Sequence, residues 1–262
     1  MVFGVQTFTI RREQKKDIEK AYLPLIELGI KEFEIARIDF NQKNAQIIKA
    51  LVEKYGIRVA AIQVKPKHVF DDVNEIVEFC KVTSCKTVVI SMLPFRCVLG
   101  PEKLFYEFLK VLDQQYEVYE AHGIELAYHH HDWEYIKLSN GKTRMEELLR
   151  KTKKIKFVHD TYWSTKSGVP SEVQIQRFGE RLQGIHLRDL TLYKKGLKVL
   201  SKDAAIGEGI IDFEKVFVEA VKVGCDYYVI EQKTAVPYEK IAVSYQNCMK
   251  LRNAYEVNEY EK

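Results

Sequence analysis

The chain of 262 residues lacks the sequence features that mark several large classes of protein. Its five cysteines fit neither a CxxC motif nor a Cys/His zinc spacing. With no recognisable secretory leader, we expect reduced thiols and a cytoplasmic protein. No run of residues approaches the roughly 20 apolar positions that a membrane span needs. There is also no GxGxxG and no GxxxxGK(S/T) motif, which argues against an open, doubly wound sheet that binds nucleotides.

A strong excess of either charge is also missing. The chain has 41 Lys and Arg against 37 Asp and Glu, a formal net charge of +4. The basic residues are scattered among acidic ones, so we expect neither a nucleic acid nor a membrane surface as partner. A hydrophobic fraction of 46% with 30% charged residues is typical of a globular protein that buries a core.

Short runs of β-forming residues alternate with segments whose apolar residues recur at helical spacing. The runs predicted as strands are 2–8, 33–38, 58–64, 87–93, 124–131, 155–163, 182–190 and 226–232. The segments predicted as helices are 17–29, 44–56, 71–85, 101–123, 143–152, 170–182, 212–224 and 237–252. Eight strand–helix pairs with short connections predict an α/β fold, a single (β/α)₈ TIM barrel over residues 1–262. Only residues 191–209 are expected to form a longer polar connection.

Ionisable side chains stand near the ends of four predicted strands. They are His131, Asp160, His186 and Glu231. The strand ends of a parallel barrel gather around one mouth, so these residues are expected to face one another. Carboxylates and imidazoles together suit a divalent cation. The sequence therefore predicts a metal site at the mouth.

The histidine run and the aspartate each allow two interpretations. On an extended strand His129 and His131 share one face, whereas His130 points the other way. Glu134 lies in the loop beyond the run and is able to bend over the mouth. Asp160 could simply cap the next helix, but Ser167 or Ser171, nearer its start, would suit that role better.

Five further residues are candidates for contact with a substrate. Arg188 follows the strand histidine on the same face, and Gln63 is placed to reach a hydroxyl or a phosphate. Trp163 offers a ring for the apolar face of a sugar, although core packing is the better explanation of a tryptophan at this position. Glu34 is either a further inward polar side chain or a salt-bridge partner at the rim. The fifth candidate is Glu208, in the segment IGEGIIDF.

The segments YHHHDWEY, HDTYWSTKSGVP, HLRDL, IGEGIIDF and YYVIEQ resemble, in this order, the sugar phosphate isomerase/epimerase family of xylose isomerase-like barrels. The resemblance covers essentially the whole chain and is specific for the superfamily rather than for a substrate. It implies that Asp160, His186 and Glu231 hold one divalent metal ion. Mn²⁺ is the expected ion, with Mg²⁺, Co²⁺ or Zn²⁺ as alternatives. In the epimerase branch the fourth ligand is a glutamate on the fifth strand. Here we expect Glu134 in that role, with His129 or His131 as the alternative.

The function implied is a metal-dependent isomerase or epimerase of a sugar, sugar phosphate or keto-sugar. A base would remove the proton α to a carbonyl and form an enediolate, with His131, Glu231 and His129 as the candidate catalytic residues. A keto-sugar or inosose dehydratase, or a 3-keto-glycoside lyase, is the alternative. An endonuclease IV-like phosphodiesterase is disfavoured because strands 58–64 and 87–93 end without His or Glu. The expected partner is a small carbohydrate, and a homo-oligomer is possible.

Overall fold

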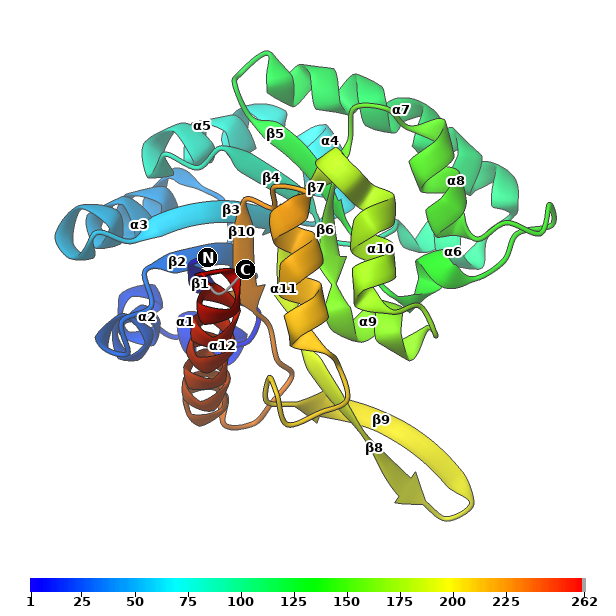
Figure 1. Ribbon diagram of the computed structural model, residues 1–262. Helices are drawn as coiled ribbons and strands as arrows, with labels where there is room; N and C mark the ends of the chain where they lie inside the picture. Colours follow the sequence, from blue (N-terminus) through cyan, green and yellow to red (C-terminus); the bar gives the residue numbers. More distant parts are fainter. Residues whose placement is uncertain (261–262) are drawn as a thin grey trace.

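The computed structural model describes residues 1–260, and side-chain surroundings up to residue 253. Eight parallel strands close into a barrel in the order β1-β10-β7-β6-β5-β4-β3-β2, with helices around the outside (Figure 1). The predicted (β/α)₈ barrel is confirmed. The barrel strands are β1 (Phe3–Gln6), β2 (Glu32–Ala36), β3 (Arg58–Val64), β4 (Thr87–Ile90), β5 (Glu125–His129), β6 (Lys156–Asp160), β7 (Leu182–Leu187) and β10 (Tyr227–Ile230).

Helices follow the barrel strands, and several short ones lie in the connections at the mouth. None of the described helices combines the length and the apolar character needed to cross a membrane. The last helix continues beyond the predicted end at residue 252. The helices are α1 (Arg11–Gln14), α2 (Ile18–Glu27), α3 (Gln42–Tyr55), α4 (Pro66–Asp71), α5 (Val73–Thr83), α6 (Phe95–Leu99), α7 (Glu102–Glu120), η1 (Asp132–Tyr135), α8 (Arg144–Lys151), α9 (Thr161–Lys166), α10 (Ser171–Phe178), η2 (Gly179–Arg181), α11 (Phe213–Lys222) and α12 (Pro237–Tyr260).

Polar residues fix the starts of several long outer helices. Asp17, Asn41 and Asp212 each accept a hydrogen bond from the backbone N–H three residues further on. Such a cap satisfies a donor that the helix itself leaves unpaired and stabilises it by about 1 kcal/mol. Helix α3 ends at Gly56, whose left-handed backbone (φ 63°) suits glycine. These local signals explain why the strand–helix alternation is readable in the sequence.

The inside of the barrel is filled by a small set of side chains below the mouth. Tyr227 on β10 packs there with the small residues Ala61 and Ala127 and with Val158. Its ring lies directly over Gly184 on β7, where an added Cβ would stand 2.2 Å from the ring. Glycine is therefore required at this position because any side chain would overlap the tyrosine. The interior of the barrel at this level is therefore a packed core.

A two-stranded antiparallel hairpin projects from the mouth between β7 and α11 (Figure 1). Its strands are β8 (Asp189–Lys195) and β9 (Lys198–Ala204). The expected polar connection over residues 191–209 is therefore wrong in its first part. Gly196, with φ 61°, forms the turn, and lysines among the β-forming residues hide the strand pattern.

The base of the hairpin is fastened by one buried carboxylate. Asp189 accepts hydrogen bonds from the backbone N–H groups of Leu190, Gly207, Gly209 and Ile211, at 2.8 to 3.2 Å. A Cβ at Gly209 would stand 2.2 Å from the Asp189 carboxylate oxygen. The glycines of the IGEG segment thus allow the backbone to approach the Asp189 carboxylate closely.

Candidate metal centre

Four buried side chains converge at the carboxyl ends of neighbouring strands. They are His129 at the end of β5, Asp160 at the end of β6, His186 on β7 and Glu231 directly after β10. One nitrogen or oxygen atom of each lies within 4.8 Å of the others. The strand register produces this convergence, because Asp160 pairs with His186, which in turn pairs with Val229.

The two imidazoles face the carboxylates in close ion-pair contacts rather than in well-aligned hydrogen bonds. His129 Nε2 lies 3.5 Å from Asp160 Oδ2, and His186 Nδ1 lies 2.9 Å from Glu231 Oε2. Both nitrogens are buried, and neither forms a hydrogen bond of good geometry, which is uncommon for such atoms. A divalent cation would satisfy both. Two nitrogens and two carboxylates suit Mn²⁺, Co²⁺ or Zn²⁺ better than Mg²⁺, so this donor set fits a transition-metal ion.

The opposite nitrogen of each imidazole is held by a second contact. His186 Nε2 lies 2.8 Å from Glu34 Oε1, and the Tyr227 hydroxyl donates to Glu34 Oε2 at 2.7 Å. His129 Nδ1 lies 3.2 Å from the carbonyl oxygen of Ser91. Such contacts fix the ring and its protonation so that the other nitrogen faces the centre. Glu34, predicted as an inward or a rim residue, is fully buried and supports His186.

Arg188 joins the centre to the hairpin. Its Nη1 lies 3.2 Å from Asp160 Oδ2 and 3.4 Å from Glu231 Oε1, while Nη2 donates to Asp203 Oδ1 at 3.0 Å. Asp203 lies on β9, which the sequence did not predict, so its part in this network was missed. Strand-forming residues on both sides of Gly196 were the signal for it.

Charge pairing holds the acids of the centre in their ionised form. Burial opposes ionisation, but Arg188 and His129 keep the pKa of Asp160 well below its ordinary range. Burial also opposes ionisation of Glu231, yet Arg188 and His186 lower its pKa to about 2. For His186 burial favours the neutral ring, and the carboxylates of Glu34 and Glu231 outweigh it and raise the pKa to about 10. The centre thus offers two carboxylates to a cation at neutral pH.

Glu134, the expected fourth ligand, does not join the centre. Its Oε1 accepts a hydrogen bond from the Tyr128 hydroxyl, and its Oε2 accepts from the backbone N–H of His131 at 2.8 Å. Side chains alternate along β5, so Tyr128 points away from the barrel interior while His129 points inward. Helix η1 then carries Glu134 back to the side of Tyr128. The place expected for Glu134 is therefore occupied by His129.

The other two histidines of the run have different surroundings. His131 lies between two tryptophans, with ring centroids 5.5 Å from Trp133 and 5.3 Å from Trp163. Its side chain faces the backbone N–H of Glu134 in a capping box at the start of η1, and the buried Nδ1 forms no well-aligned hydrogen bond. Burial, with a contribution from His129, lowers the pKa of His131 to about 3, so the ring is neutral at neutral pH. His130 faces outward, 3.1 Å from the ring of His159.

A cavity of about 580 Å³ opens over the centre. Three predicted substrate contacts line it, namely Gln63, Trp163 and Arg188. Glu208 does not, because it is 50% exposed and lies 3.8 Å from Lys240 on α12. Sequence reasoning missed several other lining residues, which come from loops and the hairpin: Arg37, Ser91, Met92, Tyr162, Ser201, Lys202, Asp203 and Lys233.

Comparison with known proteins agrees with this architecture. The family model described as "xylose isomerase-like TIM barrel" matches residues 24–251. No curated protein sequence matches the chain. A sugar phosphate isomerase/epimerase from Parabacteroides distasonis is similar in structure, with a TM-score of 0.75, 19% identity, and coverage of 92% of this chain and 91% of that one.

Two other solved structures share the fold at low identity. The probable 3-DHS dehydratase AsbF from Bacillus anthracis has a TM-score of 0.71 at 10% identity, over 95% of this chain and 99% of that one. The IOLI protein, solved with a zinc atom, has a TM-score of 0.71 at 17% identity, over 97% of this chain and 99% of that one. Since the family model covers most of its length, the chain belongs to the xylose isomerase-like TIM barrel family.

Proposed function

We propose that the chain is a divalent-metal-dependent isomerase or epimerase that removes a proton α to the carbonyl of a sugar, sugar phosphate or keto-sugar. The observation that carries the proposal is the convergence, under a cavity, of two ionised carboxylates and two imidazole nitrogens that lack well-aligned hydrogen bonds. His129, Asp160, His186 and Glu231 would hold the ion. Mn²⁺ is the ion we expect, with Co²⁺ or Zn²⁺ as alternatives.

The bound ion would supply a Lewis acid that polarises a carbonyl and makes the neighbouring C–H more acidic. Arg188, buried beside the same carboxylates, adds a fixed positive charge near the oxygen that becomes negative. Gln63 offers an amide to a substrate hydroxyl. The rings of Trp163 and Phe8 border the cavity and shield the site from water.

His131 is the residue that we assign to proton removal. It lines the cavity and lies outside the metal ligand set. Glu134 fixes the backbone at this position through its hydrogen bond to the N–H. Glu231 and His129, also predicted as bases, belong to the ligand set and are less free to move a proton. Return of the proton to the adjacent carbon gives an isomer, and its return to the other face of the same carbon gives an epimer.

A lyase that uses the same metal ion and the same base is a second candidate. Elimination needs one base and one acid. Besides His131, the cavity is lined by Lys202, whose ammonium group would be the acid.

Proton exchange with solvent tests the proposal. The Mn²⁺-loaded protein is incubated in heavy water with a panel of ketoses, ketose phosphates and 3-keto-glycosides, and NMR follows deuterium at the carbon next to the carbonyl. We expect incorporation, lowered about 10²- to 10⁴-fold in His131→Gln with metal content unchanged. Lys110→Gln, an exposed helix residue, is the control. Turnover without solvent deuterium would contradict the proposal and indicate hydride transfer or hydrolysis.

A further inference from the structure

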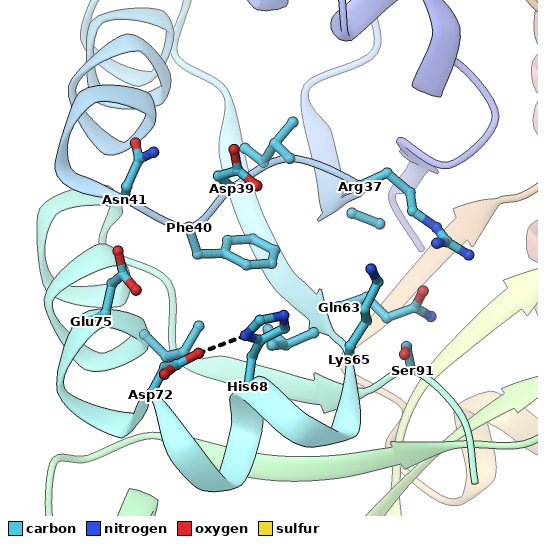
Figure 2. Close-up of a pocket in the computed structure, with 14 residues that line it drawn as sticks. Arg37, Asp39, Phe40, Asn41, Gln63, Lys65, His68, Asp72, Glu75 and Ser91 are labelled. Atoms are coloured by element: carbon cyan, nitrogen blue, oxygen red, sulfur yellow. Dashed lines mark hydrogen bonds and ion pairs between the residues drawn. The ribbon is translucent and has the colours of Figure 1, made fainter. Parts of the chain in front are cut away.

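A second cavity of about 490 Å³ adjoins the one over the metal centre. It is formed by the segments that follow β2 and β3 and by the start of α5 (Figure 2). Arg37, Gln63 and Ser91 line both cavities, so the two are continuous at these residues. The volume lies within the range of small-molecule sites. A molecule that reaches the metal centre can therefore extend into this second space.

The second cavity carries the groups that bind sugar hydroxyls rather than groups that react. The carboxylates of Asp39 and Glu75 line it, and neither has a side-chain partner among the described residues. Asn41 caps α3 with its oxygen, which leaves its amide N–H groups as donors. The described part of this cavity contains no convergent set of metal ligands. Unpaired carboxylates and amides are the acceptors and donors that ring hydroxyls use.

An aromatic ring provides the apolar surface that a sugar ring also needs. Phe40 lies half-buried in the cavity wall, opposite His68 (Figure 2), and its ring packs edge-on against Phe79 at 5.1 Å. His68 Nδ1 lies 2.5 Å from Asp72. Three carboxylates, of Asp39, Asp72 and Glu75, line the cavity against two cations, Arg37 and Lys65, so the lining carries no excess of positive charge that would select a phosphate or carboxylate group. The cavity therefore suits a neutral, hydroxyl-rich unit.

Arg37 stands at the junction of the two cavities in an unusual conformation. Its φ of 63° is left-handed, and among the described non-glycine residues only Ser84, which ends helix α5, shares this feature. The Arg37 guanidinium lies 5.1 Å from the centroid of the Phe8 ring. It has no ion-pair partner among the described residues. Backbone strain that is kept in this way is typical of functional sites, and the free N–H groups are placed to donate to an oxygen that crosses the junction.

We propose that the second cavity is a subsite for a neutral glycosyl unit, so that the substrate is a two-unit glycoside. The reacting keto-sugar lies over the metal centre, and the linked unit lies between Phe40 and Glu75. The identity of the reacting unit rests on the proposed function. Binding of the glycosyl unit does not, because it needs neither metal nor turnover.

The test measures binding to the full-length, metal-free protein by calorimetry. The probes are maltose, cellobiose, lactose, sucrose and trehalose, compared with glucose, galactose and fructose. We expect at least one disaccharide to bind about tenfold or more tightly than its component sugars. Glu75→Gln should reduce that preference about tenfold, and Glu78→Gln, on the same helix but outside the cavity, should leave it unchanged.

A second variant tests whether a loss of binding in Glu75→Gln comes from the lost contact or from misfolding. Phe40→Ala should also abolish the preference, and circular dichroism reports whether either variant has lost its fold. The inference is overturned if no disaccharide binds better than its component sugars, or if Glu75→Gln retains the preference in full. It is also overturned if inorganic phosphate binds this cavity and displaces the disaccharide. A failed deuterium exchange with intact disaccharide preference would reject the proposed chemistry and leave the subsite standing.

Discussion

Replacing Glu34 by glutamine should weaken metal binding although this residue is not a ligand. Glu34 is fully buried, and its carboxylate receives His186 Nε2 at 2.8 Å and the Tyr227 hydroxyl at 2.7 Å. The negative charge makes the imidazole a better electron donor at Nδ1 and holds the ring in place. Glutamine has nearly the same shape and can still accept one hydrogen bond, but it carries no charge.

The expected magnitude follows from this contact. A hydrogen bond to a charged group contributes about 1.5–3 kcal/mol, and 1.4 kcal/mol corresponds to a tenfold change in affinity. Because Glu34 is shielded from solvent, little of this contribution is lost to screening. We therefore expect Glu34→Gln to weaken Mn²⁺ binding about 10- to 100-fold. This agrees with the usual effect of removing a partner of a metal-bound histidine.

The assay is a competition titration of Mn²⁺ against a fluorescent chelator at fixed pH, with circular dichroism as a check on folding. Tyr227→Phe is the matched control, since it removes the second contact of Glu34 and leaves the contact to His186. We expect Tyr227→Phe to change the affinity less than about threefold. An unchanged affinity in Glu34→Gln would refute the reasoning. Equal losses in both variants would also refute it, by showing general damage to the barrel interior.

Three further predictions concern the site and its support. His129→Ala should lose most of its metal, while Glu134→Gln should retain it, as measured by elemental analysis of the purified proteins; the reverse would restore Glu134 as the ligand. Burial raises the pKa of Glu134 to about 7 from an ordinary 4.5, so its stabilising contribution is full below pH 4.5 and is lost as the pH rises through 7. Between pH 4.5 and 7.5 the free energy of unfolding of the parent should therefore fall by about 3 kcal/mol relative to that of Glu134→Gln. Urea titrations at several pH values measure this difference, and the same pH dependence of the free energy of unfolding in both proteins would contradict the prediction. Asp189→Ala leaves four backbone N–H groups without their acceptor and should cost about 3 kcal/mol or more; an unchanged melting temperature would argue against the role of Asp189, and Asp212→Ala, which removes only a helix cap, should cost about 1 kcal/mol.

The barrel could be predicted from the sequence because its signals are local. Capping residues such as Asn41 and terminal glycines such as Gly56 mark the helices, and the β-forming runs lie between them. Three members of the centre, Asp160, His186 and Glu231, could also be placed at one mouth. Each follows a hydrophobic strand, and the parallel order brings strand ends together.

The fourth member, His129, was predicted only as an alternative to Glu134, because the course of the chain after β5 depends on a tertiary contact. The strand ends at His129, and the next turn is directed by the bond between Tyr128 and Glu134. Asp203, the partner of Arg188, could not be predicted for a similar reason. Asp203 becomes its neighbour only when β8 and β9 pair, and that register depends on a turn within a lysine-rich segment.

The hairpin also bears on how this barrel can change over evolution or by design. Asp189 and Ala204, at the two ends of the hairpin, pair with each other. The hairpin therefore begins and ends at the same place on the barrel. Residues at its base, such as Ser201 and Asp203, reach the cavity, whereas the outer part around Leu197 is exposed. Since no barrel strand pairs with the hairpin, its outer part can be shortened, lengthened or exchanged without opening the barrel. Changes in the outer part would thus leave the metal centre and the cavity intact, whereas changes at Ser201 or Asp203 would alter the lining of the cavity.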